Sequence, residues 1–103
     1  MEKEGYVYLL CDGEKFKIGM TRQNKIEKRI LELQTGNPND IWLHSYYKTN
    51  YPHKIEKMMH ARHVASNIKN EWFEMSIQEV LNFKNECQKC ENILKALKDN
   101  PFI

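Results

Sequence analysis

The chain has 103 residues, 41% of them hydrophobic and 29% charged, and a formal net charge of +2. This length suits one domain, and the hydrophobic content argues against intrinsic disorder. No apolar run approaches the ~18 residues of a membrane-spanning helix, the charged start is unlike a secretory signal, and three cysteines predict reduced thiols instead of a disulfide framework. We therefore expect one cytoplasmic domain over residues 1–103, without a membrane partner.

Two segments rich in strand-forming residues, 5–11 and 15–20, flank the pair Asp12-Gly13. Such a pair predicts a β-hairpin with a two-residue turn. With that turn, Tyr8 and Lys17 lie directly opposite each other on one face of the hairpin. A turn longer by two residues changes the partners and keeps the two faces. The other face is apolar and carries Val7, Leu9, Phe16 and Ile18.

A first helix is expected over residues 24–35. Asn24 and, three residues later, Glu27 resemble a capping box. A left-handed backbone at Gly36, followed by Pro38, would end the helix. Its apolar stripe consists of Ile26, Ile30 and Leu33.

The next elements are a third strand over residues 41–48 and a second helix from Tyr51 to about Ser66. Pro52 suits the first helical position, where its missing N–H costs nothing. Positive charge concentrates here, because the acid Glu56 stands alone among Lys54, Lys57, Arg62 and Lys69. Such a patch either neutralises the phosphates of a nucleic acid or forms a solvated helix face, and charge does not separate the two.

The last element is a helix over residues 76–99, with Ser76 as its cap and Glu79 at the third helical position. Its apolar residues recur three and four positions apart: Val80, Phe83, Cys87, Cys90, Leu94 and Leu97. This seam lies either on the chain's own sheet or against a partner helix in a homodimer. The order β-β-α-β-α-α predicts an α+β fold with a three-stranded antiparallel sheet packed against helices.

The segment Cys87-Gln88-Lys89-Cys90 has the spacing of half a zinc site. A closed zinc site needs four ligands, and the third cysteine, Cys11, belongs to the apolar face of the hairpin. Both cysteines of the segment also fall on the helix seam, where a free thiol behaves as a small hydrophobic side chain. We therefore interpret the pair as core residues.

Glu56, His60 and His63 share one stripe of the second helix, at positions i, i+4 and i+7. A glutamate and a histidine one turn apart chelate a transition metal, whereas a lone carboxylate in a basic segment suits Mg²⁺. The alternative is a polar flank of the helix. Arg29 either covers the core with the aliphatic part of its side chain or brings a fixed charge to a phosphate. Tyr8, considered by itself, is an ordinary aromatic residue of a strand.

Taken together and in order, four features resemble the GIY-YIG nuclease superfamily: Tyr-Val-Tyr-Leu-Leu at 6–10, Lys-Ile-Gly-Met-Thr at 17–21, Arg29, and Glu56 in a helix after a third strand. The similarity is closest to the short meiotically up-regulated-gene and phage-type branch. That branch is matched further by Leu-Gln-Thr-Gly-Asn-Pro (33–38), Ile-Glu-Lys-Met-Met-His (55–60) and Glu-Trp-Phe (71–73). The resemblance covers about residues 5–76.

The resemblance implies a DNA endonuclease that depends on Mg²⁺ or Mn²⁺. Glu56 falls on the family's metal-binding glutamate, and Arg29 on the arginine that stabilises charge on the phosphate. Tyr8 falls on the tyrosine that takes or relays the proton of the attacking water. Lys17 stands where the second signature has tyrosine, and opposite Tyr8 it would favour the phenolate. His60 would contact the phosphate or support the metal residue.

Two alternatives stay open. A degenerate member of the superfamily would bind nucleic acid without cutting it, because Lys17 replaces a tyrosine. A non-catalytic domain would instead bind a partner through the seam at 80–97. The family's downstream asparagine has two candidates here, Asn67 and Asn70, and Glu-Trp-Phe at 71–73 is expected to be a short edge segment without chemistry.

Overall fold

Five antiparallel strands form the sheet, in the order β3-β1-β2-β5-β4. The computed structural model describes residues 4–22, 25–36 and 40–98. The strands are β1 (Gly5–Cys11), β2 (Phe16–Thr21), β3 (Trp42–Thr49), β4 (Asn67–Lys69) and β5 (Trp72–Phe73). The predicted α+β class is confirmed, but the expected number of three strands is wrong. The two additional strands come from a short hairpin at residues 67–73, which extends the sheet beyond β2.

The prediction that residues 71–73 form an edge segment is wrong, because β5 lies between β2 and β4 in the sheet. The Asn67 side chain closes this hairpin by donating to the carbonyl oxygens of Asn70 (2.7 Å) and Trp72 (3.1 Å). Asn70 has a φ of +54°, in the left-handed region that asparagine tolerates better than most residues. Both candidate asparagines therefore build the turn.

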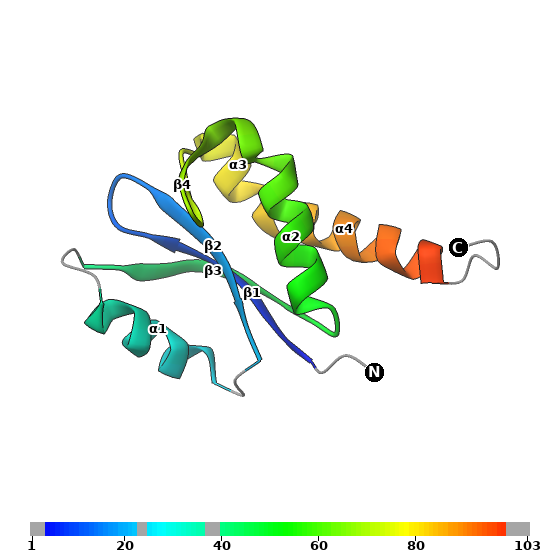
Figure 1. The fold of residues 1–103 in the computed structure, drawn as a ribbon, viewed down its shortest axis with the longest axis horizontal. Helices are drawn as coiled ribbons and strands as arrows, with labels where there is room; N and C mark the ends of the chain where they lie inside the picture. Colours follow the sequence, from blue (N-terminus) through cyan, green and yellow to red (C-terminus); the bar gives the residue numbers. More distant parts are fainter. Residues whose placement is uncertain (1–3, 23–24, 37–39, 99–103) are drawn as a thin grey trace.

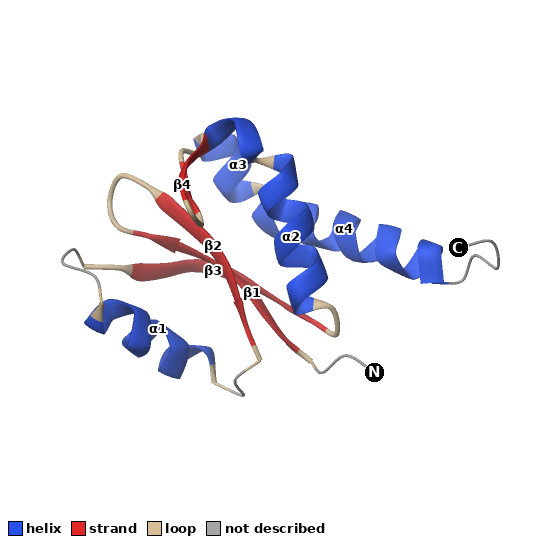
Figure 2. Cartoon of the chain, viewed as in Figure 1, coloured by secondary structure: helices blue, strands red, loops and turns tan. Residues whose placement is uncertain are grey.

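Helices cover both faces of the sheet (Figures 1 and 2). They are α1 (Ile26–Thr35), α2 (Pro52–Arg62), α3 (Ile77–Leu81) and α4 (Phe83–Lys98), with a 3-10 turn, η1, at Val64–Ser66. On β1, Val7 and Leu9 pack with α2 and α4, whereas Tyr8 and Leu10 pack with α1. The sheet therefore separates two cores. Within the described ranges, no helix is both long enough and apolar enough to cross a membrane.

The turn between β1 and β2 is longer than the predicted Asp12-Gly13 pair. The Asp12 carboxylate accepts hydrogen bonds from the backbone N–H groups of Glu14 (3.0 Å) and Lys15 (2.8 Å). Gly13 has a φ of +100°, which only glycine adopts freely. These contacts hold residues 12–15 together as a four-residue turn.

The longer turn shifts the strand register by two residues. Tyr8 lies opposite Gly19, and Lys17 lies opposite Leu10. The predicted pairing of Tyr8 with Lys17 is therefore wrong. The predicted faces are confirmed, because side chains alternate along a strand and an even shift keeps each one on its face.

The apolar stripe of α1 packs against the sheet as predicted, through Ile26, Ile30 and Leu33. The end of the helix differs from the prediction, because Gly36 has a φ of −92° and is not left-handed. Its N–H returns to the carbonyl oxygen of Leu33 at 3.2 Å, which closes the last turn without a special backbone conformation. The expected cap Asn24 and the stop at Pro38 lie outside the described residues.

The predicted helix over residues 76–99 is two helices. Ser76 caps α3 by a reciprocal pair of hydrogen bonds with Glu79, as predicted. Helix α3 ends before Asn82, whose backbone is not helical (φ −90°, ψ 2°), and α4 begins at Phe83. The seam continues across the break into the chain's own core, and only its last residue, Leu97, is 42% exposed.

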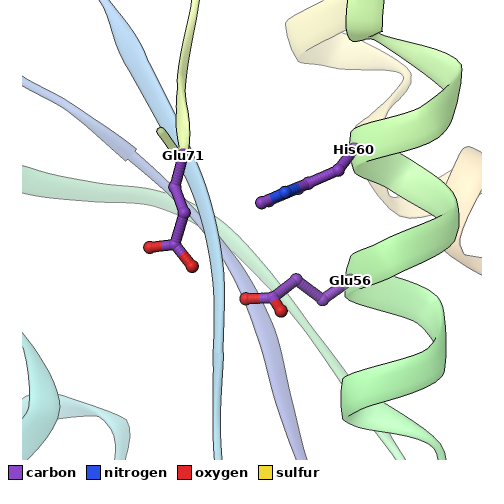
Figure 3. Close-up of side chains that lie close together, drawn as sticks. All are labelled: Glu56, His60 and Glu71. Carbon is purple, nitrogen blue, oxygen red and sulfur yellow. The ribbon is translucent and has the colours of Figure 1, made fainter. Parts of the chain in front are cut away.

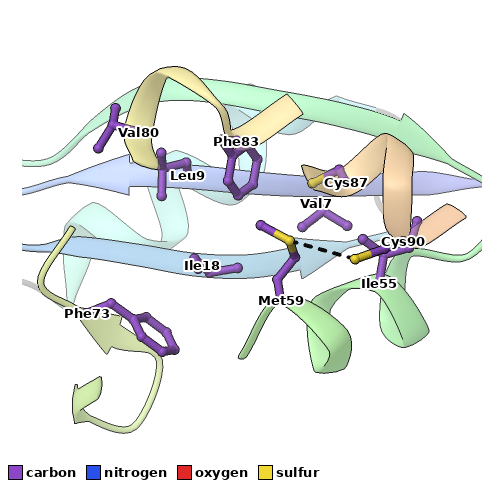
Figure 4. Packing of buried hydrophobic residues seen from close by; sticks show 10 residues of the cluster. All are labelled: Val7, Leu9, Ile18, Ile55, Met59, Phe73, Val80, Phe83, Cys87 and Cys90. Carbon is purple, nitrogen blue, oxygen red and sulfur yellow. Dashed lines mark hydrogen bonds between the residues drawn. The ribbon is translucent and has the colours of Figure 1, made fainter. Parts of the chain in front are cut away.

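Cys87 and Cys90 lie fully buried on this seam, among side chains of β1, β2 and α2 (Figure 4). The Cys90 Sγ is 4.0 Å from the Sδ of Met59. Burial raises the pKa of both thiols, so they stay protonated and poorly suited to bind a metal. The interpretation of the pair as core residues is confirmed.

Candidate active site

Three side chains with metal-binding atoms meet beside the edge of β2 (Figure 3). Glu56 and His60 project from successive turns of α2, and Glu71 comes from the turn between β4 and β5. One oxygen or nitrogen atom from each side chain lies within 4.8 Å of the others, and all three residues are half-buried. Across residues 4–22, 25–36 and 40–98, this is the only such group of three histidine, cysteine or acidic side chains.

The main chain of Ile18 positions two of the three residues. The N–H of Ile18 donates to the carbonyl oxygen of Glu71 (3.2 Å), and the carbonyl of Ile18 is 2.8 Å from the Nε2 of His60. Ile18 is fully buried, so both of its main-chain groups need protein partners. Because a carbonyl only accepts, Nε2 carries the ring proton and Nδ1 offers its lone pair.

The Glu56 carboxyl group lies beside a second acid. Burial raises the pKa of Glu56 to about 7, together with the charge of Glu71 and a hydrogen bond to it, whereas Lys17 and Lys57 act in the opposite direction. Near neutral pH the Glu56 carboxyl group is therefore protonated in part of the molecules and hydrogen-bonds to Glu71. Two carboxylates and one imidazole nitrogen are a donor set that fits a divalent cation, which would replace this proton.

Lys17 contacts Glu71 instead of Tyr8. Its Nζ is 3.4 Å from the Oε2 of Glu71 and lies 5.8 Å from the centre of the Trp72 ring. The Lys17 side chain is only 17% exposed. Lys17 therefore brings a positive charge to the two acids, and its predicted role of tuning Tyr8 from across the hairpin has no geometric basis.

Tyr8, from β1, interacts with Arg29, from α1. The Arg29 guanidinium donates a hydrogen bond to the Tyr8 hydroxyl, and it also lies 3.4 Å from Glu32. Burial raises the pKa of Tyr8 even though Arg29 opposes this shift. The phenol is therefore neutral at neutral pH. The charges of Glu56 and Glu71 also act on this pKa, which places Tyr8 near the group of three.

Gly19 makes room for the Tyr8 ring. A Cβ atom on Gly19 would lie 2.5 Å from the Tyr8 hydroxyl oxygen and 2.6 Å from the ring carbon that bears it. Such distances are far shorter than a van der Waals contact. The glycine of the second signature is thus required by the position of the tyrosine of the first.

His63 does not join the site, although the helical spacing placed it on the stripe of Glu56 and His60. Helix α2 ends at Arg62, and the His63 ring turns toward α3 and α4. Its Nδ1 is 3.0 Å from Glu79, and its Nε2 is 3.0 Å from Glu86. His63 therefore joins three helical segments and has no contact of this kind with the site.

Sequence reasoning missed Glu71. We expected Glu56 to be an isolated acid in a basic segment, but the hairpin of β4 and β5 brings Glu71 to its carboxyl group. The one available signal was the match of Glu-Trp-Phe at 71–73 to the short GIY-YIG branch, and no chemistry was assigned to it.

Comparison with known proteins gives one family match. The sequence model of the T5orf172 domain matches residues 5–88, a range that includes every residue of the site described above. No curated protein and no solved structure matches the chain.

Proposed function

The chain belongs to the T5orf172 domain family, and from that premise we propose that it is a divalent-metal-dependent DNA endonuclease of the GIY-YIG type. The family match is consistent with a nuclease-like or DNA-binding role. The observation that carries the proposal is the convergence of Glu56, His60 and Glu71 near the paired Tyr8 and Arg29. Such a combination of acids, arginine and tyrosine suits the hydrolysis of a phosphodiester.

Glu56 is the residue that we propose to hold the metal ion, Mg²⁺ or Mn²⁺. When bound, such an ion neutralises charge on the scissile phosphate and assists the leaving oxygen. The raised pKa of Glu56 supports this role, since a cation bound to the two neighbouring carboxyl groups would replace the proton of Glu56 and offset their repulsion. His60 belongs to the same group as the two acids, and the Nζ of Lys17 is 3.4 Å from Glu71, so each can contact a phosphate oxygen bound beside them.

Arg29 and Tyr8 act on the phosphate and on the attacking water. The Arg29 side chain is 35% exposed, so it can bond to a non-bridging oxygen while it holds Tyr8. The Tyr8 hydroxyl accepts from Arg29 and keeps its own proton, with which it orients the water. Tyr8 would accept the proton of that water only as a phenolate, a form that requires a nearby cation to lower its raised pKa.

The surroundings of the site suit a nucleic-acid backbone. Helices α1 and α2 lie on opposite faces of the sheet, and each carries exposed lysines: Lys28 on α1, with Lys25 just before it, and Lys54 and Lys57 on α2. A duplex that reaches the edge of β2 would therefore meet positive charge from both helices.

The test is nicking of a supercoiled plasmid by the full chain, with Mg²⁺ or Mn²⁺ and with a chelator as the blank. We expect Glu56→Gln to lower the nicking rate by roughly a hundredfold or more, because it removes the charge that holds the ion. Glu74→Gln is the matched control, since Glu74 is an exposed acid near the same hairpin. Equal nicking by Glu56→Gln and the wild type would show that the site is assigned to the wrong residue.

A second function, DNA binding without cleavage, is favoured by two observations. Lys17 stands in place of a tyrosine and pairs with Glu71, and burial keeps Tyr8 protonated. A non-cleaving domain would bind DNA in a salt-sensitive manner and leave the plasmid intact with either metal. The nicking assay, run beside a binding titration at two salt concentrations, separates the two functions.

A further inference from the structure

The two residues beside Glu56 carry an inference that rests on the proposed metal-dependent activity and deepens it. We propose that Glu71 and His60 are metal ligands together with Glu56, and that this set binds a transition-metal dication in preference to Mg²⁺. Glu71 is the residue to which the sequence assigned no chemistry. His60 then acts through its Nδ1 atom as a ligand, not as a contact to phosphate.

The separation of the three side chains fits a single ion. Ligand atoms at about 2.1 Å from one ion lie no more than about 4.2 Å apart. One ligand atom from each side chain, for His60 one of its two ring nitrogens, already lies within 4.8 Å of the others (Figure 3). Side-chain movements of a few tenths of an ångström, about the amplitude of ordinary thermal motion, close this difference.

The His60 ring is oriented in the way that metal-binding histidines usually are. Its Nε2–H donates to a main-chain carbonyl, that of Ile18, and the other ring nitrogen stays available. The ring also packs edge-on against Phe73, with 5.1 Å between the ring centres. Because both contacts fix the plane of the imidazole, the ligand nitrogen is held in place before an ion arrives.

Glu71 is tied to the same residue of β2 through its carbonyl oxygen, which accepts from the N–H of Ile18. One buried peptide segment thus positions a ligand from α2 and a ligand from the hairpin of β4 and β5. In the metal-free protein the Lys17 ammonium group, 3.4 Å from the Glu71 carboxylate, offsets its negative charge. The ligands come from two segments, α2 and the hairpin of β4 and β5. The attachment of His60 and Glu71 to the same buried residue of β2 makes a built site instead of a chance cluster of acids.

The imidazole decides which ion is preferred. Mg²⁺ binds oxygen ligands and keeps most of its water, so a nitrogen ligand gains it little. Mn²⁺ accepts both carboxylate and imidazole, and the affinity of nitrogen-containing sites rises further along the first transition row. A set of one imidazole and two carboxylates therefore favours Mn²⁺ over Mg²⁺.

The test uses MnCl₂ as the probe and the full chain without DNA. The electron paramagnetic resonance signal of free Mn²⁺ is lost on binding, so a titration gives the number of sites and their affinity. We expect one Mn²⁺ per chain, displaced only by an excess of MgCl₂ of about tenfold or more. Glu71→Gln should weaken Mn²⁺ binding by roughly 10- to 100-fold, and His60→Gln should reduce the preference for Mn²⁺ over Mg²⁺ more than it weakens Mg²⁺ binding.

Two matched variants control for general effects of substitution. Glu74→Gln changes an exposed acid next to the same hairpin, and His53→Gln changes an exposed histidine on the same helix. Both should bind Mn²⁺ like the wild type. Glu71→Gln removes both the repulsion of Glu56 and the ion pair with Lys17, so the metal-free variant should unfold within a few degrees of the wild type. Thermal unfolding without metal therefore distinguishes a loss of binding from a loss of fold.

The outcomes separate this inference from the proposed nuclease. An unchanged Mn²⁺ titration in Glu71→Gln, or displacement of Mn²⁺ by an equal amount of Mg²⁺, overturns the inference while metal-dependent nicking can still be observed. Selective Mn²⁺ binding that depends on Glu71 and His60 supports the inference even if the plasmid stays intact, a result that overturns the nuclease. If the wild type binds no Mn²⁺, the ligand set is wrong.

Discussion

At the scale of single residues, the pair Tyr8 and Gly19 shows how one side chain requires another. The Tyr8 ring is 1% exposed and lies directly across the strands from Gly19. The space that glycine leaves is the space that the phenol fills, and the phenol in turn receives the hydrogen bond of Arg29. The tyrosine of one sequence signature and the glycine of the other are therefore parts of a single packing arrangement.

Gly19→Ala should destabilise the protein by about 1–3 kcal/mol, because the new methyl group overpacks a buried site. The clash at 2.5 Å should also move the Tyr8 hydroxyl away from Arg29. Urea unfolding measures the change in free energy. Gly36→Ala is the control, since among the described residues the nearest atom that its Cβ would meet beyond its chain neighbours is the Leu33 carbonyl oxygen at 4.0 Å, and its φ is ordinary. A loss of stability in Gly36→Ala as large as in Gly19→Ala would refute the packing argument.

At the scale of elements, the hairpin of β4 and β5 contributes more to the site than its length predicts. It lengthens the sheet, buries Phe73 in the core with α2 and α4, and delivers Glu71 to the acid on α2. Two of its residues, Asn67 and Asn70, are needed to close it. Such short strands carry a weak sequence signal because alternation cannot be read over two or three residues.

The apolar seam of α3 and α4 also belongs to the core, and Cys87 and Cys90 are fully buried on it. Replacing both Cys87 and Cys90 by alanine should lower the free energy of unfolding by roughly 1–4 kcal/mol in total, because two buried sulfur atoms are lost. The purified wild type should hold no zinc at these thiols. Stoichiometric zinc that disappears in the double cysteine variant, but stays in Glu56→Gln, would contradict this interpretation.

At the scale of the whole molecule, the site makes the fold less stable than it could be. The half-buried acids Glu56, on α2, and Glu71, on the hairpin of β4 and β5, lie beside each other. The pKa of Glu56 in the folded chain is raised to about 7, above the value of 4.5 that is usual for a glutamate. The folded state therefore binds more protons than the unfolded state between these two pH values, and stability falls as the pH rises through that window.

Glu56→Gln should remove this contribution. Without divalent metal, the variant should gain stability relative to the wild type as the pH rises from about 4.5 to about 7, and the difference should level off above that. Urea unfolding of both proteins in a chelating buffer at several pH values measures it. The exposed Glu74→Gln should show a flat difference, and a flat difference in Glu56→Gln would mean that the pKa of Glu56 is not raised in the folded chain.

The outer end of α4 is the part of the molecule that bears on the association of two chains. The seam that we expected to serve either the core or a partner is buried in the chain from Val80 to Cys90. The large apolar side chains that stay exposed on α4 are at its outer end, where Ile93 and Leu97 are each 42% exposed. A homodimer through the C-terminal helix is still a prediction, and measuring the mass in solution over a range of concentrations tests it.

The sequence by itself determined the main elements, their apolar faces and most of the candidate site. Alternation along residues 5–11 and the spacing from Val80 to Leu94 are local patterns, so they can be read without knowing what the residues touch. The order and type of the site residues were also readable, since the resemblance to GIY-YIG nucleases rests on linear motifs. Tyr8, Arg29, Glu56 and His60 were chosen in this way.

Only the tertiary structure decided which of these residues meet. The strand register followed from hydrogen bonds of the Asp12 side chain, which lengthen the turn and leave Lys17 opposite Leu10. The partner of Glu56 followed from a short hairpin that docks on β2 and carries Glu71 with it. The first result depends on local side-chain hydrogen bonds within a turn, and the second on contacts between residues distant along the chain. No periodic pattern records either of them, because periodicity reports which face a residue lies on and not which partner it meets.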